Sequence, residues 1–352
     1  MRSEVDRPSA AAVPGPRGVL RFLRTLRSQK WARLLAGVAL VAGLVVIGLQ
    51  GRLPDPHAVL RASVSADYGW IVLAVALQAA SIGAFALQQR NLLHGLGVRL
   101  RRSRTSAIIL AATAISIAVP AGPALSTAYT VREYRRAGAA REIALASVIV
   151  SGLASIGGLA LVYAGGGLAV LAGTPTAGLS WEPLLTVLGL TVATAATVVV
   201  GRRWSRRPAA DRASGGRLAR LVHSATTSLR EAWQAGAGLR GADWAVALGY
   251  AAAKWITDLM CLVAAVRALD EPVSVITLAG IYLGVQIVRQ VPLTPGGIGV
   301  IDTALVAGLT AAGADVISAT AAVLIYRLIS CWLLIPIGGA AAVALRRART
   351  AP

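Results

Sequence analysis

The chain reads Arg289-Gln-Val-Pro-Leu-Thr-Pro-Gly-Gly-Ile-Gly-Val-Ile-Asp302 between two strongly apolar flanks. Pro292 and Pro295 lack an amide proton, so a helix stops there, and the glycines allow the backbone to turn. In a bilayer, a broken helix is tolerated only where protein buries it or where it lines a wet cavity. Interrupted helices of this kind mark substrate sites in transporter folds. This stretch is therefore the first candidate for a working site.

The composition places the flanks in a membrane. Hydrophobic residues make up 56% of the chain and charged residues only 14%, against about 25% charged residues in soluble domains. The net charge of +20 does not indicate nucleic acid as a partner, because the arginines lie in short clusters between apolar spans, as at a cytoplasmic membrane surface. Cys261 and Cys331 fall inside apolar spans and the histidines are scattered, so no disulfide, metal site or cofactor is indicated.

The apolar stretches divide the chain into a basic cytoplasmic tail, residues 1–30, and one polytopic membrane domain, residues 31–347. A crossing helix needs about 20 apolar residues, which predicts full spans at 32–50, 70–89, 143–171, 183–200, 243–266 and 316–345. Two further apolar stretches, 106–131 and 274–313, are broken by proline and glycine. The polar linker 201–242 predicts an amphipathic helix on the cytoplasmic surface, or else a solvated linker with a helical patch.

The distribution of positive charge predicts the topology. We suppose that the N-terminus is cytoplasmic and that both broken stretches return to the side from which they enter. Most of the 35 Lys and Arg residues then lie inside, in the tail and in segments 90–104, 132–141, 202–240 and 346–349. Segments 172–182 and 311–315 then face outward. The prediction is an all-α integral membrane protein with about six full spans, two re-entrant helical hairpins and both termini cytoplasmic.

The two broken stretches resemble each other without gaps. Pro120 matches Pro295 and Gly122 matches Gly297, and a long apolar span follows each break. Under the predicted topology the first hairpin, 106–131, enters from inside and the second, 274–313, from outside. This arrangement is an inverted-topology repeat, a plan in which substrate binds between the two hairpins near the membrane midplane.

The candidate substrate-binding residues lie in and near these breaks: Ser126, Thr127, Arg289, Thr294, Gly296, Gly297, Gly299, Asp302 and Arg327. The arginine fork suits a lipid phosphate, and we expect Arg289 and Arg327 to share one anionic head group. Alternatively, these arginines bond exposed carbonyls of the broken helix, and Asp302 is one candidate partner for Arg289. Asp302 either offsets the dipole of the following helix, meets a cationic head group or couples to protons.

Other polar residues lie inside predicted spans. Lys254 and Asp258 are four residues apart and form either a structural ion pair or part of a functional site. Ser147, Ser151 and Ser155 line one helix face at four-residue spacing, which predicts a close helix–helix interface.

The second broken stretch, continued by Ala311-Ala-Gly-Ala-Asp315 and Ala322-Val-Leu-Ile-Tyr-Arg327, resembles the flippase-like membrane region of lysylphosphatidylglycerol synthases (the MprF type). The segment from Pro120 to Arg136 is similar to the weaker first motif of that family. The resemblance implies a multi-helix inner-membrane protein with two re-entrant hairpins, associated with moving lipids between leaflets. Asp302 stands where the family usually has glutamate. The chain ends soon after Arg349 without a soluble aminoacyl-transfer domain, so we do not expect it to synthesise lysyl-lipid.

The leading hypothesis is a lipid translocase acting on a phospholipid or a polyprenyl-phosphate-linked lipid, with membrane lipids as its partners. One alternative is a secondary transporter of a small polar solute. Others are a membrane-embedded, lipid-dependent transferase and an accessory protein that binds envelope-synthesis enzymes. We expect no enzymatic activity, because the sequence shows no catalytic triad, no metal-ligand cluster and no aspartate-rich metal–diphosphate motif.

Overall fold

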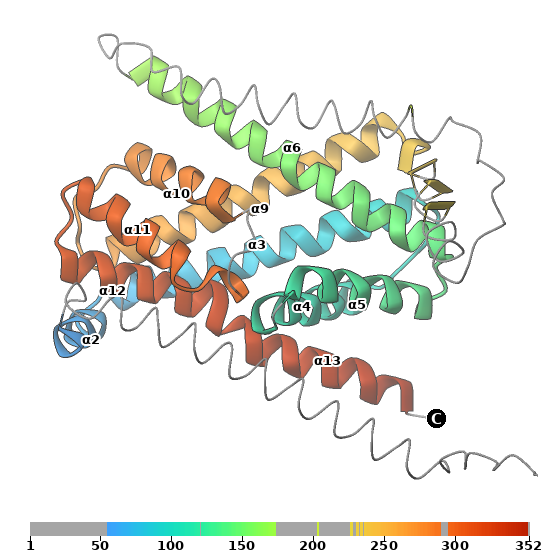
Figure 1. Cartoon of the computed structure of the whole chain (residues 1–352), viewed down its shortest axis with the longest axis horizontal. Coiled ribbons are helices and arrows are strands. Elements are labelled where there is room, and N and C mark those ends of the chain that lie inside the picture. Colours follow the sequence, from blue (N-terminus) through green and yellow to red (C-terminus); the bar gives the residue numbers. More distant parts are fainter. Residues whose placement is uncertain are drawn as a thin grey trace, which may run out of the picture. The chain divides into compact units, whose positions relative to one another are not determined.

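The computed structural model describes residues 55–119, 121–173, 236–289 and 295–350, together with residues 203, 226–227, 230–231 and 233–234. These residues form helices and turns and no strand, which confirms the all-α class (Figure 1). The predicted tail 1–30, the predicted spans 32–50 and 183–200 and most of the linker 201–242 lie outside the described residues.

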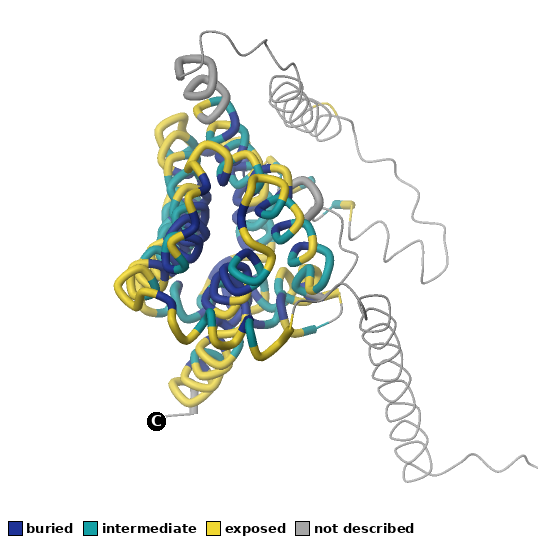
Figure 2. The backbone as a smooth tube through the Cα atoms, turned by 90° about the vertical axis from the view of Figure 1, so that its left-hand side faces the viewer, coloured by how far each residue is buried: buried dark blue, intermediate teal, exposed yellow. Residues whose placement is uncertain are grey.

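Four of the predicted spans are long helices in the described part of the chain. They are α3 (Tyr68–Gly95), α6 (Arg141–Gly173), α9 (Gly241–Arg267) and the combination of α12 (Val316–Arg327), η2 (Leu328–Trp332) and α13 (Leu334–Thr350). All four are long and apolar enough to cross a membrane. α9 packs against both α3 and α6. Figure 2 shows buried positions facing into the bundle and exposed positions facing outward, as expected of helices whose outer faces meet lipid.

The last of these helices is interrupted, although the sequence predicts one span over 316–345. Residues 328–332 form a π-helix, in which the Leu333 amide donates to the Leu328 carbonyl at 2.8 Å. Pro336 follows within α13 and has no amide proton for the Trp332 carbonyl four residues earlier. π-Turns of this kind are rare and frequently mark functional sites.

Both broken stretches are helix pairs. α4 (Arg102–Ala118) packs against α5 (Gly122–Arg136), and α10 (Val275–Arg289) packs against α11 (Val300–Ala311). At about 1.5 Å per residue, the 17-residue α4 is about 25 Å long and the 12-residue α11 about 18 Å. Both are shorter than the roughly 30 Å hydrocarbon core. The breaks fall where the prolines and glycines predict them.

The two breaks lie against each other. The short helix η1 (Pro295–Gly297) in the second break packs on α4. A Cβ at Gly296 would lie 3.3 Å from Ile117 Cγ2 at the end of α4. At the first break, a Cβ at Gly122 would lie only 2.1 Å from the Ser116 carbonyl oxygen, so the turn between α4 and α5 leaves no room for a side chain.

Charged segments sort to opposite ends of the described bundle. We call the basic end the segments 90–104, 132–141, 236–241 and 346–349. There, one hydrophobic cluster joins Leu93, Leu100, Ala139 and Leu345, and Asn91 bonds the Asp243 carbonyl at 3.2 Å.

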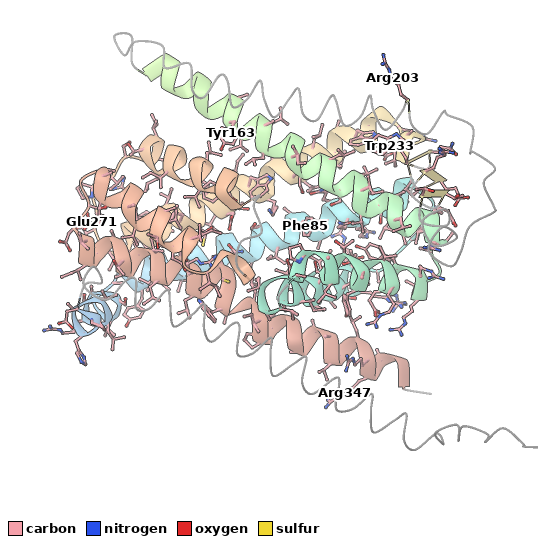
Figure 3. All side chains as sticks on the ribbon, in the orientation of Figure 1. Phe85, Tyr163, Arg203, Trp233, Glu271 and Arg347 are labelled. Atoms are coloured by element: carbon pink, nitrogen blue, oxygen red, sulfur yellow. The ribbon has the colours of Figure 1, made fainter. Side chains whose placement is uncertain are left out.

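We call the opposite end the acidic end; it comprises segments 55–68, 268–275 and 311–316. The Asp67 amide donates to the Ala268 carbonyl there, at 2.8 Å. The short helix α2 (Pro56–Val64) packs on α12 at this end. Figure 3 shows Glu271 at the acidic end and Arg347 at the basic end. α4 begins and α5 finishes at the basic end, whereas α10 begins and α11 finishes at the acidic end.

Candidate functional site

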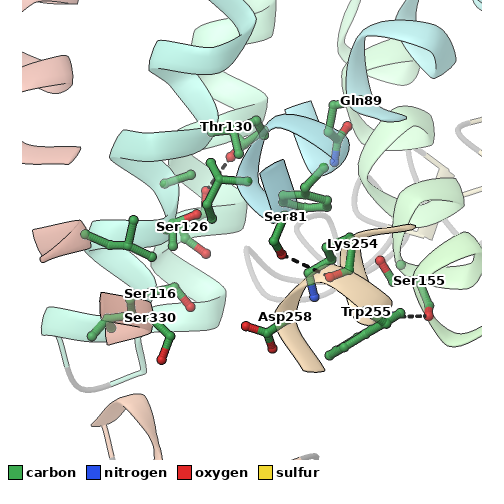
Figure 4. Close-up of a pocket in the computed structure, with 18 of the residues that line it drawn as sticks. Ser81, Gln89, Ser116, Ser126, Thr130, Ser155, Lys254, Trp255, Asp258 and Ser330 are labelled. Carbon is green, nitrogen blue, oxygen red and sulfur yellow. Dashed lines mark hydrogen bonds between the residues drawn. The ribbon is translucent and has the colours of Figure 1, made fainter. Parts of the chain in front are cut away.

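A polar cavity of about 530 Å³ lies inside the apolar bundle, among α3, α4, α5, α6, α9 and the η2–α13 segment (Figure 4). Its polar lining consists of Gln78, Ser81, Gln89, Thr113, Ser116, Ser126, Thr127, Thr130, Ser155, Lys254, Asp258 and Ser330. Polar groups at membrane depth need a protein partner or water. A cavity with this many hydroxyl and amide groups is suited to water or to a polar ligand, which makes it the candidate site.

The charges of the cavity wall come from α9. Lys254 and Asp258 are one helical turn apart and face the same side, toward Ser116, Ser126 and Ser330 in Figure 4. They are the only charged residues among the described residues that line the cavity. The Lys254 ammonium lies 3.3 Å from the centroid of the neighbouring Trp255 ring, a cation–π contact. The cavity therefore presents one cationic and one acidic group side by side.

Asp258 is 5% exposed and is held by tyrosines from two other helices. The Tyr282 hydroxyl of α10 donates to Asp258 Oδ2 at 2.6 Å, and the Tyr326 hydroxyl of α12 approaches the same oxygen at 3.3 Å. Hydrogen bonds to a charged acceptor are the strong ones in proteins. The carboxylate thus ties α9 to α10 and α12.

Hydroxyl groups around the cavity are held in place by backbone carbonyls. Ser126 donates to the Pro123 carbonyl at 3.0 Å, and Thr130 donates to the Ser126 carbonyl at 2.8 Å. Where α3 packs on α9, Ser81 donates to the Lys254 carbonyl at 3.0 Å. These hydroxyls use their protons within the protein and can offer oxygen lone pairs to a ligand.

The predicted serine face of α6 contacts α3 at Ser151. Gln88 and Gln89 donate to the Ser151 hydroxyl at 3.1 and 2.8 Å. Ser147 and Ser151 are both buried. Ser155, one turn later, lines the cavity, and its carbonyl accepts the Trp255 indole N–H at 2.9 Å.

The lining of the cavity includes exposed residues on α5 and α6 in the described part of the chain. Among its lining residues, Thr127 on α5 and Gly152 and Ile156 on α6 are exposed. A Cβ at Gly152 would meet nothing within 4 Å, so this position borders open space.

The second helix break forms a separate cluster around Arg327. Arg327 Nη2 donates to the Gly296 carbonyl at 2.9 Å, and Arg327 Nε lies 2.7 Å from Asp302 Oδ1. The other oxygen of Asp302 accepts the Gly299 amide at 2.9 Å, at the start of α11. We call this cluster the break brace: Gly296, Gly299, Asp302 and Arg327.

The predicted site residues therefore fall into two groups. Ser126 and Thr127 line the cavity, whereas Gly296, Gly299, Asp302 and Arg327 form the break brace, with Gly297 beside them. Ile117 connects the groups, since it lines the cavity and touches η1. Arg327 bonds the Gly296 carbonyl, which is the kind of contact named as the alternative to a head group. The Arg289 side chain and Thr294 lie outside the described residues.

Sequence reasoning misses several cavity residues. Gln78, Gln89, Ser116 and Ser330 line the cavity, and no motif in the sequence points to them. A signal does exist in the glutamines of the otherwise apolar span of α3, where an amide is costly without a partner. The sequence pairs Asp258 only with Lys254, because its tyrosine partners lie 24 and 68 residues away in the chain.

Comparison with known proteins gives two findings. The sequence model of the family described as the lysylphosphatidylglycerol synthase TM region matches residues 34–338. A UPF0104 membrane protein of Methanothermobacter thermautotrophicus is 28% identical to the chain over 87 residues. That alignment spans 25% of this chain and 26% of the relative, so it covers about a quarter of each protein.

Proposed function

The chain belongs to the lysylphosphatidylglycerol synthase TM-region family, and we propose that it moves an anionic membrane lipid between the two leaflets of the cytoplasmic membrane. The lipid is a phospholipid or a polyprenyl-phosphate-linked lipid. The observation that carries the proposal is the polar cavity, which contains Lys254 and lies inside helices apolar enough to cross a membrane. The head group passes through this cavity while the acyl or prenyl tails stay in the lipid.

The chemistry of the cavity supports a polar, anionic head group. A charged residue at membrane depth costs about 2.5–3.5 kcal/mol on insertion scales, and such residues usually mark a transport path. Lys254 supplies the positive charge, and Thr127 and Ser330 add hydroxyl groups to the same space. The volume of about 530 Å³ falls within the range of roughly 300–1,000 Å³ that is typical of ligand sites.

The exposed lining residues favour a lipid over a small solute. Thr127, Gly152 and Ile156 lie on the outer parts of α5 and α6, so a head group can enter sideways while its tails remain outside the bundle. A solute transporter needs access from water alone. The proposal assigns no catalytic step to the chain.

The proposal includes a topology. The α4–α5 and α10–α11 pairs are re-entrant hairpins that enter from opposite sides and form an inverted-topology repeat. Their short lengths and their meeting at Ile117 and Gly296 support this arrangement. The basic end faces the cytoplasm, in accord with the positive-inside rule, and both chain termini are cytoplasmic.

Filling the cavity tests the proposal. Gly152→Leu adds a bulky side chain to the cavity lining, at a position where a Cβ would meet nothing within 4 Å. Gly165→Leu is the matched control, because Gly165 lies on the same helix, also borders open space and does not line the cavity. At both positions, the change from glycine to leucine raises the helix propensity by a similar amount.

The assay follows fluorescent phosphatidylglycerol and fluorescent polyprenyl phosphate in reconstituted vesicles, with dithionite to quench the outer leaflet. We expect the wild type and Gly165→Leu to move at least one of these lipids and Gly152→Leu to move it at least tenfold more slowly. Movement of neither lipid by the wild type, or equal rates for the two variants, would overturn the proposal.

A further inference from the structure

We propose that Asp258 is a proton-binding site that couples lipid movement to a proton gradient, so that one proton and one anionic head group occupy the cavity together. This inference rests on the proposed function and adds the energy source of lipid movement. It starts from the only carboxylate among the described residues that line the cavity.

Electrostatics links the proton to the lipid. Lys254 and Asp258 are one turn apart on the same face of α9, and both line the cavity. A phosphate that approaches Lys254 also approaches the Asp258 carboxylate and is repelled by it. This repulsion is strong in a protein interior, where the dielectric constant is low. A proton on Asp258 removes the repulsion and leaves Lys254 to attract the phosphate, so each of the two ligands favours binding of the other.

The step is a simple proton transfer. A hydronium ion in the cavity gives its proton to the Asp258 carboxylate, which yields water and a neutral carboxylic acid, and the reverse step releases the proton on the other side. Tyr282 and Tyr326 donate to Asp258 Oδ2 and compensate the buried charge in the unprotonated state. The titratable neighbours of Asp258 on its own helix, α9, are Lys254 and Cys261.

The other walls of the cavity present no competing titratable group among their described lining residues. α3, α6 and the α4–α5 pair contribute serines, threonines, glutamines and apolar side chains, and the η2–α13 segment contributes Ser330 and Leu334. The proton site of the cavity is therefore assigned to Asp258.

Protonation of Asp258 also affects the second helix break. When Asp258 becomes neutral, its hydrogen bonds with Tyr282 and Tyr326 lose their charge assistance, so α10 and α12 are held less tightly to α9. Tyr326 is followed in the chain by Arg327, which bonds Gly296 and Asp302 in the break brace. A change in the cavity is thereby passed through adjacent residues of α12 to the second hairpin.

The test uses reconstituted vesicles of the full chain with fluorescent phosphatidylglycerol and with fluorescent polyprenyl phosphate, at equal and at unequal pH on the two sides. With the wild type, a pH difference should accumulate the transported lipid in one leaflet, by up to about tenfold per pH unit for one proton per lipid. Asp258→Asn keeps an oxygen acceptor for the tyrosines but cannot take a proton, so the lipid should distribute equally at any gradient. The control is Asp315→Asn. Asp315 is the exposed N-cap of α12, so this variant should respond as the wild type does.

A second measurement covers the case in which Asp258→Asn does not fold. Addition of the transported lipid to one side of wild-type vesicles should remove protons from that side, which a pH-sensitive dye in the medium detects. Accumulation by Asp258→Asn equal to that of the wild type, or lipid movement by the wild type without proton uptake, would overturn the coupling alone. Absence of lipid movement by the wild type at every pH would instead overturn the proposed function.

Discussion

Arg327 Nε lies 2.7 Å from Asp302 Oδ1, while Nη2 of the same guanidinium donates to the Gly296 carbonyl. One side chain of α12 thus holds residues on both sides of the turn that begins α11. The planar guanidinium can make both contacts at once, which a lysine ammonium on a flexible stem does less well. The last long helix is in this way fixed to the second break.

The first prediction concerns this brace. Arg327→Ala should lower the stability of the protein by about 1.5–3 kcal/mol, the value of a hydrogen bond to a charged group. Part of the loss is offset because the Asp302 side chain is 33% exposed, although its Oδ1 is buried. Arg327→Lys should be intermediate. Thermal unfolding in detergent can be followed with a thiol-reactive dye, since Cys261 and Cys331 are buried and react on unfolding. An unchanged melting temperature with loss of lipid binding would restore Arg327 as a head-group ligand.

The second prediction compares the two tyrosines on Asp258. Tyr282→Phe removes the 2.6 Å hydrogen bond and should destabilise the protein by about 1.5–3 kcal/mol. Tyr326→Phe removes a contact at 3.3 Å and should cost less, about 1 kcal/mol or below. The same unfolding assay measures both. A larger effect of Tyr326→Phe would contradict this ranking of the two contacts.

The third prediction concerns the first break. Gly122→Ala would bring a methyl group to 2.1 Å from the Ser116 carbonyl oxygen, so the α4–α5 turn must open and the melting temperature should fall sharply. Gly165→Ala is the control. Its Cβ meets nothing within 4 Å, and alanine favours the helix by about 0.8–1 kcal/mol. Equal stability of the two variants would show that the turn adapts easily.

The fourth prediction concerns the second break. Gly297 has φ +67°, and its Cβ would lie 2.1 Å from Ile301 Cδ1. Gly297→Ala should therefore destabilise by about 1–2 kcal/mol from the left-handed backbone alone, with a further loss from the contact. Adding Ile301→Ala should not restore wild-type stability, because the backbone strain remains. Gly284→Ala in α10, with nothing within 4 Å, should not destabilise the protein.

The fifth prediction tests the orientation of the two ends. Ala312→Cys at the acidic end should react with an impermeant thiol reagent in intact cells, and Ala140→Cys at the basic end should react only after the cells are opened. Both positions are exposed, whereas the native Cys261 and Cys331 are buried and contribute little background. Labelling of Ala140→Cys alone in intact cells would reverse the proposed orientation.

The helix breaks are predictable because their causes are local. Proline removes an amide proton and glycine permits positive φ wherever it occurs in the chain, and Gly296, Gly297 and Gly299 adopt φ values of 61°, 67° and 86°. The four long helices in the described residues also follow from local composition. Length and apolar character decide a span without reference to the rest of the fold.

The cavity is not predictable in the same way, because it depends on which helix faces reach each other. Asp302 contacts Arg327, 25 residues further along the chain, and the sequence does not single out this pair. In the sequence, Lys254 is the evident partner of Asp258, but in the structure tyrosines of α10 and α12 also bond the carboxylate. The π-turn has a local signal, Pro336, but a proline can be accommodated by a kink as well, so its form depends on packing.

The π-turn at Leu328–Trp332 has a consequence for the cooperativity of the last long helix. Its i→i+5 bond and the missing amide of Pro336 weaken the ladder of backbone hydrogen bonds at one place. In hydrogen–deuterium exchange, α12 should therefore protect its amides as one block, together with α2 and α11 on which it packs. α13 should form a second block with α4 and open at a different free energy. The last membrane crossing would then consist of two units that can open separately.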